Sequence, residues 1–392
     1  MKKSYFIVSV FVLLLFNGDG FGQEKTEKEP ALFSNLNKAK MFSPIVSVET
    51  WATYSHGAKT SDGADYAGQP NLMFRRVRFG GKGHPYSWLG YQVELNLDRL
   101  GQSDYSSVKG SYGGLDVWKA FFTAKLLAKS DLLYLHAGYY WAAVSREFNT
   151  SPWAVGSLDK SRADWYLRKF MTGKGNGIES GFGLGGLKNY DNFGINYRAG
   201  VYFPKAYSSA EYSSVLYTGR LMLSLGDPEQ TSYSYTLSGN QWGKRNGVTL
   251  GFGGSAMSQS EVGDLLYKDS YTYGADILIN LGGLRIDGEY FKMKRKSGGY
   301  ADYDGDEWHI RAGYDFVIDH TFLEPVIHYE KYKGEGAKEI FSKIGDDKTL
   351  DIGVNWYIHK DKLMFGAHYV DQNGSISSDL GSYGALAFQF RL

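Results

Sequence analysis

The chain has 392 residues, a formal net charge of +1 and no cysteine. The near-neutral charge gives no electrostatic basis for binding nucleic acid, and the lack of cysteine excludes disulfides, thiol chemistry and cysteine-ligated metals. The 31 Tyr, 9 Trp and 50 Gly beside only 8 Pro are unusual for a soluble protein. They suit a curved β-sheet with aromatic girdles at two membrane interfaces.

The N-terminus has the features of a secretory signal peptide. A basic start precedes an apolar run, Tyr5–Phe16, that is too short to span a bilayer as a helix. Small residues follow, so we expect a signal peptide over 1–22 and cleavage near Gln23. Residues 23–44 are polar and rich in Lys and Glu, and we expect a periplasmic segment there. These features predict export across the inner membrane.

From residue 45 onward, apolar and polar residues alternate with period two in one segment after another. In Trp308–Phe316, one face carries Trp, Ile, Ala, Tyr and Phe, and the other carries His, Arg, Gly and Asp. Such a strand has one face against an apolar medium and the other against water. We predict strands over 45–54, 71–81, 87–97, 115–126, 132–141, 177–187, 193–203, 214–225, 247–257, 271–280, 284–293, 307–317, 322–332, 349–358, 363–370 and 383–391.

The fold class that these strands predict is all-β, a 16-stranded antiparallel transmembrane β-barrel over 45–392, with the even strand number of bacterial single-chain barrels. Short and long connections alternate, so the short turns should be periplasmic and the long loops extracellular. The longest loop, 142–176, follows the fifth strand. The segment 226–246 is long but falls where a periplasmic turn belongs, and Tyr233–Leu237 within it could be a further strand.

The register follows from the cost of about 2–4 kcal/mol for a charged side chain that faces lipid at mid-bilayer. The basic residues directed to the lumen are Arg76, Arg78, Lys119, Lys125, Arg198, Arg220, Arg285 and Arg311. The acidic ones are Glu94, Glu179, Asp276, Asp287, Glu289, Asp315, Glu324, Glu330 and Asp351.

Three motifs that could indicate ligand chemistry are better explained by the barrel. Gly181–Gly186 fits a nucleotide-binding glycine pattern, but no helix start follows it, so we predict a strand. Asp302–Asp306 is similar to a calcium loop with a misplaced Gly, and we predict a solvated acidic loop. We expect no catalytic residue, cofactor or metal site, because the histidines lie on separate strands without ligand spacing: His136, His309, His328 and His368.

Phe74–Gly81 (FRRVRFGG) resembles the second strand of the phosphate-selective porin O/P family of Gram-negative outer membranes. This resemblance implies a homotrimeric porin, embedded in outer-membrane lipid and lipopolysaccharide, whose long loop 142–176 folds into the lumen as the constriction. Further segments that resemble the family follow in order: Gly90–Asn96, Leu115–Phe121, Leu135–Tyr140, Val144–Glu147, Asn196–Tyr202 and Gly247–Gly254.

The resemblance also implies a path for anions that is lined by basic side chains. Arg198 and Arg220 lie on neighbouring strands, and Arg146 and Arg162 lie in the loop expected to fold across them. The acidic opposite wall departs from a phosphate-specific lining, so we expect passive diffusion of small hydrophilic solutes, anions such as phosphate, with a modest anion preference. The candidate residues are Arg76, Arg78, Lys119, Lys125, Arg146, Arg162, Arg168, Arg198 and Arg220.

Two other functions stay open at this point. A barrel with a plugged lumen and a structural or adhesion role would show salt-bridged luminal charges and no conductance. A rim-active outer-membrane hydrolase would pair acidic and His residues at the outer rim, where the loops offer only His56.

Overall fold

The computed structural model describes residues 41–59, 68–209, 211, 213–257, 259–262, 265–299, 301–336 and 340–392. The expected signal peptide, 1–22, and residues 23–40 of the expected periplasmic segment lie outside the described residues. In the part of the chain that is described, no helix is long and apolar enough to cross a membrane.

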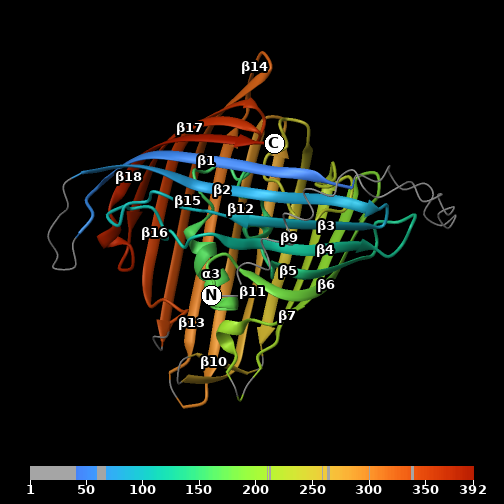
Figure 1. Cartoon of the computed structure of the whole chain (residues 1–392), viewed down its shortest axis with the longest axis horizontal. Helices are drawn as coiled ribbons and strands as arrows, with labels where there is room; N and C mark the ends of the chain where they lie inside the picture. Colours follow the sequence, from blue (N-terminus) through green and yellow to red (C-terminus); the bar gives the residue numbers. More distant parts are fainter. Residues whose placement is uncertain are drawn as a thin grey trace, which may run out of the picture. The chain divides into compact units, whose positions relative to one another are not determined.

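Sixteen long strands form one antiparallel sheet, as the alternation predicts. The sheet closes into a barrel because β1 pairs with both β2 and β18 (Figure 1). The first eight are β1 (Ser43–His56), β2 (Gln69–Tyr86), β3 (Leu89–Asn96), β4 (Asp116–Lys125), β5 (Tyr134–Trp141), β6 (Ile178–Asn189), β7 (Phe193–Tyr202) and β8 (Leu216–Gly226). The others are β9 (Asn246–Met257), β11 (Leu265–Leu281), β12 (Leu284–Ser297), β13 (Tyr303–Tyr314), β15 (Thr321–Gly336), β16 (Gly345–His359), β17 (Leu363–Asn373) and β18 (Ser382–Arg391).

Two short strands extend long ones and do not change the strand number. β10 (Ser260–Val262) follows β9 and pairs with β11, as β9 does. β14 (Phe316–Ile318) follows β13 and pairs with β15, as β13 does. The predicted sixteen strands are therefore confirmed.

The predicted register is also confirmed. On β13, Ile310 is 51% exposed on the outer face, whereas its neighbours His309 and Arg311 are 3% and 2% exposed. Of the charged residues directed to the lumen, all are buried except Lys125, which is partly buried and contacts Asp131 at 2.7 Å. Charge on the inner face and apolar side chains on the outer face are what lipid requires of a membrane-spanning sheet.

The segment between β8 and β9 is not a barrel strand. β8 and β9 pair directly along their length, so the possible strand at Tyr233–Leu237 is wrong. Leu237 instead forms one isolated parallel bridge with Thr150 of the long loop. The segment therefore leaves the sheet and meets the long loop in the lumen.

The connections carry four short helices in the described residues. α2 (Arg146–Asn149) and α3 (Arg162–Thr172) belong to the long loop between β5 and β6. The one-turn helices η1 (Lys205–Tyr207) and η2 (Ser378–Leu380) lie in the loops after β7 and β17.

Candidate functional site in the lumen

The sequence of α3 explains both its bounds and the face it buries. The Ser161 side chain accepts a hydrogen bond from the Asp164 amide at 3.1 Å, which caps the first turn, and Gly173 ends the helix with φ +74°. Between these ends, apolar residues recur at helical spacing and form one stripe. The buried members of this stripe are Ala163, Tyr166, Leu167, Phe170 and Met171.

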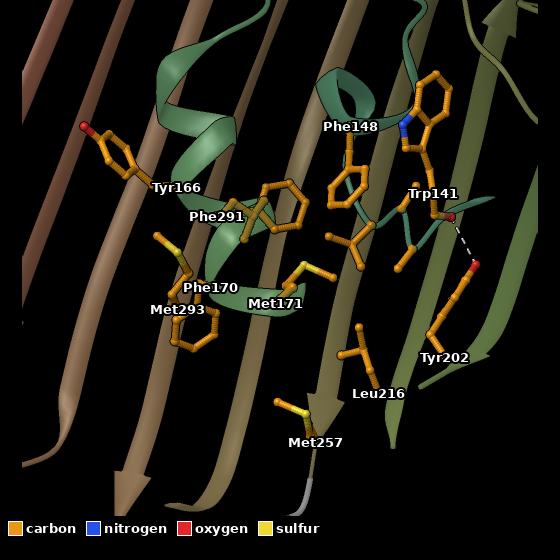
Figure 2. Packing of buried hydrophobic residues seen from close by; sticks show 14 of the residues in the cluster. Trp141, Phe148, Tyr166, Phe170, Met171, Tyr202, Leu216, Met257, Phe291 and Met293 are labelled. Carbon is orange, nitrogen blue, oxygen red and sulfur yellow. Dashed lines mark hydrogen bonds between the residues drawn. The ribbon is translucent and has the colours of Figure 1, made fainter. Parts of the chain in front are cut away.

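This stripe lies against the luminal side of the wall (Figure 2). Phe170 and Met171 belong to the same buried cluster as Phe291 and Met293 of β12. Full burial of a large apolar side chain contributes about 1.5–3 kcal/mol. The prediction that the long loop folds into the lumen is confirmed, and apolar packing holds it there.

Polar contacts fix the same loop to the acidic wall. Glu330 of β15 accepts hydrogen bonds from the Ser161 hydroxyl at 2.5 Å and from the Arg162 amide at 2.6 Å. The Tyr166 hydroxyl donates to Asp347 of β16 at 2.6 Å. Several acidic side chains on this wall are thus occupied in holding the loop.

The segment 227–245 braces the loop from the short-turn end of the barrel. Glu229 accepts two hydrogen bonds from Arg146, at 2.7 and 2.9 Å. The Asn149 amide side chain donates to the Tyr235 carbonyl at 3.0 Å, and the Leu237 amide donates to the Asn149 carbonyl at 3.0 Å. The two inward segments therefore pack against each other in the lumen.

Two cavities lie on the β1–β5 side, and they share part of their lining. The outer cavity, toward the long loops, has a volume of about 370 Å³, and the inner cavity, toward the short turns, also has about 370 Å³. Both are lined by the same four residues: Arg78, Trp118, Trp141 and Pro152. These four residues, called the neck below, lie between the two cavities, next to β2, β3 and β4.

Basic side chains dominate the outer cavity, where eight basic residues face three acidic ones. A β-bulge supplies one of them. The register between β1 and β2 shifts between Glu49 and Thr50, so Arg75 and Arg76 both point inward, although a regular strand alternates. Strict alternation predicts only Arg76 and Arg78 inward, so Arg75 was missed.

At the neck, cations lie on indole rings. The Arg78 guanidinium is 3.5 Å from the centroid of Trp118. The ammonium groups of Lys119 and Lys160 are 4.6 and 5.5 Å from the centroid of Trp141. Because an aromatic face attracts a cation without cancelling its net charge, these contacts position the charges and leave them able to act on a solute.

Acidic partners reduce the surplus of positive charge without removing it. Arg78 contacts Asp98 at 2.5 Å, Arg75 contacts Asp159 at 2.5 Å, and Arg76 contacts both Asp159 and Glu49. Beside them, desolvation lowers the pKa of Lys160 to about 7 and the pKa of Lys109 to about 8. Both lysines belong to loops, and both line the outer cavity.

The nine predicted path residues separate into two groups. Arg76, Arg78, Lys119 and Arg168 line the outer or inner cavity. The other five do not line either: Lys125 pairs with Asp131, Arg146 with Glu229 and Asp276, Arg162 with Asp347, Arg220 with Asp276, and Arg198 lies over Tyr235.

Arg198 and Arg220 are directly opposite each other on β7 and β8, but the inward segments cover them. Arg220 donates to Asp276 at 2.5 and 2.9 Å and to the Val144 carbonyl at 2.9 Å. Arg146 reaches the same Asp276 at 3.2 Å. Arg146 and Arg220 therefore converge as expected, but they do so on the buried carboxylate of Asp276.

The other motifs have the following positions. Gly181–Gly186 lies in β6, as predicted. The acidic loop predicted over Asp302–Asp306 is wrong for its last four residues, because Tyr303–Asp306 opens β13 and pairs with β12, where Asp304 contacts Lys294 at 3.0 Å. Among the described residues, two overlapping groups could hold a metal ion: Glu147, Asp287 and His309, and Glu289, Glu307 and His309.

Residues 56–380 match the family model of phosphate-selective porin O and P. The chain belongs to this family. Family and fold together identify an outer-membrane channel for small solutes in Gram-negative bacteria. No curated protein matches the sequence of this porin.

Solved structures with the same fold share little sequence with it. The anion-selective porin from Comamonas acidovorans has 12% identity and a TM-score of 0.59, over 90% of this chain and 100% of that one. A trimer form of OmpT from Vibrio cholerae has 13% identity and a TM-score of 0.52, over 91% and 100%. OprB from Pseudomonas putida has 8% identity and a TM-score of 0.54, over 90% and 94%.

Proposed function

We propose that this porin conducts small hydrophilic anions, phosphate among them, by passive diffusion along the β2–β4 side of its lumen. The observation that carries the proposal is the neck: two cavities, in each of which basic side chains outnumber acidic ones, share Arg78 and the indoles of Trp118 and Trp141. In a narrow passage with walls of low dielectric constant, fixed positive charge replaces part of the hydration that an anion gives up.

Within this proposal, six of the nine predicted residues either act on the solute or hold the inward segments. Arg76, Arg78, Lys119 and Arg168 act directly on the solute, together with Arg75, Lys109 and Lys160, which the sequence prediction did not include. Arg146 and Arg220 act through position, since they hold the inward segments in place at Asp276. The carboxylates of Asp98, Asp159 and Glu94 beside the path support a modest anion preference and not a phosphate-specific site.

The assembly and the mature form are part of the proposal. The fold is shared with a protein solved in a trimer form, OmpT of Vibrio cholerae, which supports a homotrimer for this chain in outer-membrane lipid and lipopolysaccharide. The N-terminal pattern supports export with removal of residues 1–22.

The surroundings of His56 at the outer rim support a channel and not a rim-active hydrolase. His56 stacks on Tyr369, with ring centroids 5.9 Å apart, and in the described residues it forms no ion pair with a carboxylate. A rim hydrolase would need such a partner to orient the imidazole.

Single-channel recording in planar bilayers tests the proposal against a plugged barrel. The open path predicts discrete conductance steps and a reversal potential on the anion side in a KCl gradient. A barrel without conductance would reject the channel, and a reversal potential on the cation side would reject the anion path.

A further inference from the structure

Two carboxylates and one imidazole converge on the luminal wall beneath α2. Glu289 belongs to β12, and Glu307 and His309 belong to β13, where the register places His309 directly opposite Glu289. One donor atom from each of the three side chains lies within 4.8 Å of the others. The three residues are 5%, 0% and 3% exposed. They form a buried set of donors of the type that binds metal ions.

Two of these side chains have no hydrogen-bond partner among the described residues. Both carboxylate oxygens of Glu307 and both ring nitrogens of His309 are buried and unpaired. The nearest carboxylates to the imidazole are Asp287 at 3.7 Å and Glu289 at 3.9 Å, beyond hydrogen-bond distance. Since buried polar groups are almost always paired, these atoms can accept a ligand, and the carboxylate of Glu307 favours a positive one.

Neighbouring cations do not supply this charge. Arg311 is engaged with the adjacent carboxylates, with distances of 2.8 Å to Asp287 and 3.2 Å to Glu147. Within the described part of the chain, no Arg or Lys forms an ion pair with Glu289 or Glu307. In the described residues, the only basic group that pairs with either carboxylate is the imidazole of His309, 3.9 Å from Glu289.

Glu289 keeps a free lone pair on each oxygen although both oxygens are hydrogen-bonded. One accepts from the Ser145 hydroxyl at 3.0 Å, and the other accepts from the Glu147 amide at 2.9 Å. A carboxylate has about four lone-pair positions, so two remain for a metal. Through the same two bonds, an ion held by Glu289 is connected to the start of α2.

We propose that Glu289, Glu307 and His309 form a binding site for one divalent transition-metal cation, with Zn²⁺ as the representative ion. Two carboxylates neutralise a dication, and imidazole nitrogen favours Zn²⁺ and its neighbours over Mg²⁺ or Ca²⁺. Metal–ligand bonds of about 2.0–2.2 Å need the donors somewhat closer together than they are, which rotation of the two flexible glutamates can provide. The site ties β12 and β13 to the long loop.

The sequence alone shows only part of this site. Glu307 and His309 are two residues apart on β13 and so share one face of that strand, but Glu289 lies on β12, and its proximity depends on the pairing of β12 with β13. The sequence expectation of no metal site rested on the lack of a local ligand spacing.

Metal counting on the full-length protein, extracted from outer membranes in detergent, tests the proposal. After treatment with a chelator and dialysis against ZnCl₂, the wild type should retain about one Zn²⁺ per chain, because three ligands define one site. Glu307→Gln and His309→Gln should bind Zn²⁺ at least about tenfold more weakly. Glu335→Gln, which changes an exposed carboxylate on β15, is the matched control and should bind as the wild type does.

Retention by Glu307→Gln equal to that of the wild type would overturn the site, as would a wild type that retains no Zn²⁺. If the variants do not fold, the wild type alone decides. Zn²⁺ should raise its unfolding temperature, since a ligand that binds only the folded state stabilises it. The same concentration of Mg²⁺ should not, and an equal effect of both ions, or of neither, would contradict the proposal.

Discussion

The Arg78 guanidinium lies 3.5 Å from the centroid of the Trp118 ring, and both residues line the outer as well as the inner cavity. On its other side, Arg78 donates to Asp98 at 3.0 and 2.5 Å. An aromatic face and a carboxylate thus fix a cation at the neck. We therefore expect an anion path along β2 to depend most on Arg78.

The bidentate contact between Arg146 and Glu229 should control the position of both inward segments. Glu229→Gln keeps the size of the side chain but leaves the buried Arg146 with less compensating charge, and breaking a buried pair costs up to about 3–5 kcal/mol. We expect an assembled barrel whose single-channel current becomes noisier and larger. Glu335→Gln, in an exposed pair with Lys333, should leave the current unchanged. Identical current traces from the two variants would show that the pair does not hold the loop.

The absence of a side chain at Gly253 allows the long loop to approach the wall. A Cβ at Gly253 would collide with the Val144 carbonyl oxygen, whereas a Cβ at Gly219 on the adjacent strand would have no atom within 4 Å. Gly253→Ala should therefore displace the start of the loop and change the conductance. Gly219→Ala should conduct as the wild type does, and an equal effect of both substitutions would contradict the close approach.

The outer face of the barrel should reject charge. Ile310→Arg places a guanidinium against lipid at a cost of about 2–4 kcal/mol at mid-bilayer, and should impair assembly. Gln92→Arg adds the same side chain to the inner cavity and should assemble normally. The fraction with heat-modifiable migration on gels measures assembly. Equal losses for both variants would refute the register.

The anion preference should fall as pH rises through neutrality. Burial lowers the pKa of Lys160 to about 7 and that of Lys109 to about 8, so both are charged below these values and neutral above them. Loss of two positive charges beside the path reduces the attraction for anions. Reversal potentials from pH 6 to pH 9 measure this change, and Lys160→Gln should show a smaller change. A pH-independent wild type would contradict the role of these lysines.

Strand number, register and the inward position of the long loop could all be predicted from the sequence. The alternation of residues such as His309 and Ile310 is enforced by lipid, and each strand carries this signal independently. The family resemblance gave the position of the loop. Its packing depends on an apolar stripe in α3 that meets luminal Phe291 and Met293.

The path itself could not be predicted because it depends on contacts between distant segments. Arg220 obeys the alternation and faces inward, yet Asp276 and the carbonyl of Val144 occupy its guanidinium. Arg75 lines the outer cavity because of a bulge between β1 and β2. The segment 227–245 carries no periodic signal for entering the lumen, since its partners are residues of the long loop and of distant strands, such as Arg146 and Asn196.

Reversal potentials of the wild type, Arg78→Gln and Lys268→Gln in a KCl gradient test the anion path most directly. Lys268 is an exposed cation on β11, so its variant controls for the loss of one positive charge. The path along β2 predicts that only Arg78→Gln shifts toward cation selectivity. The shift should be larger in dilute salt, because the screening length is about 30 Å at 0.01 M and only about 3 Å at 1 M. An Arg78→Gln channel with the reversal potential of the wild type at both salt concentrations would contradict the account.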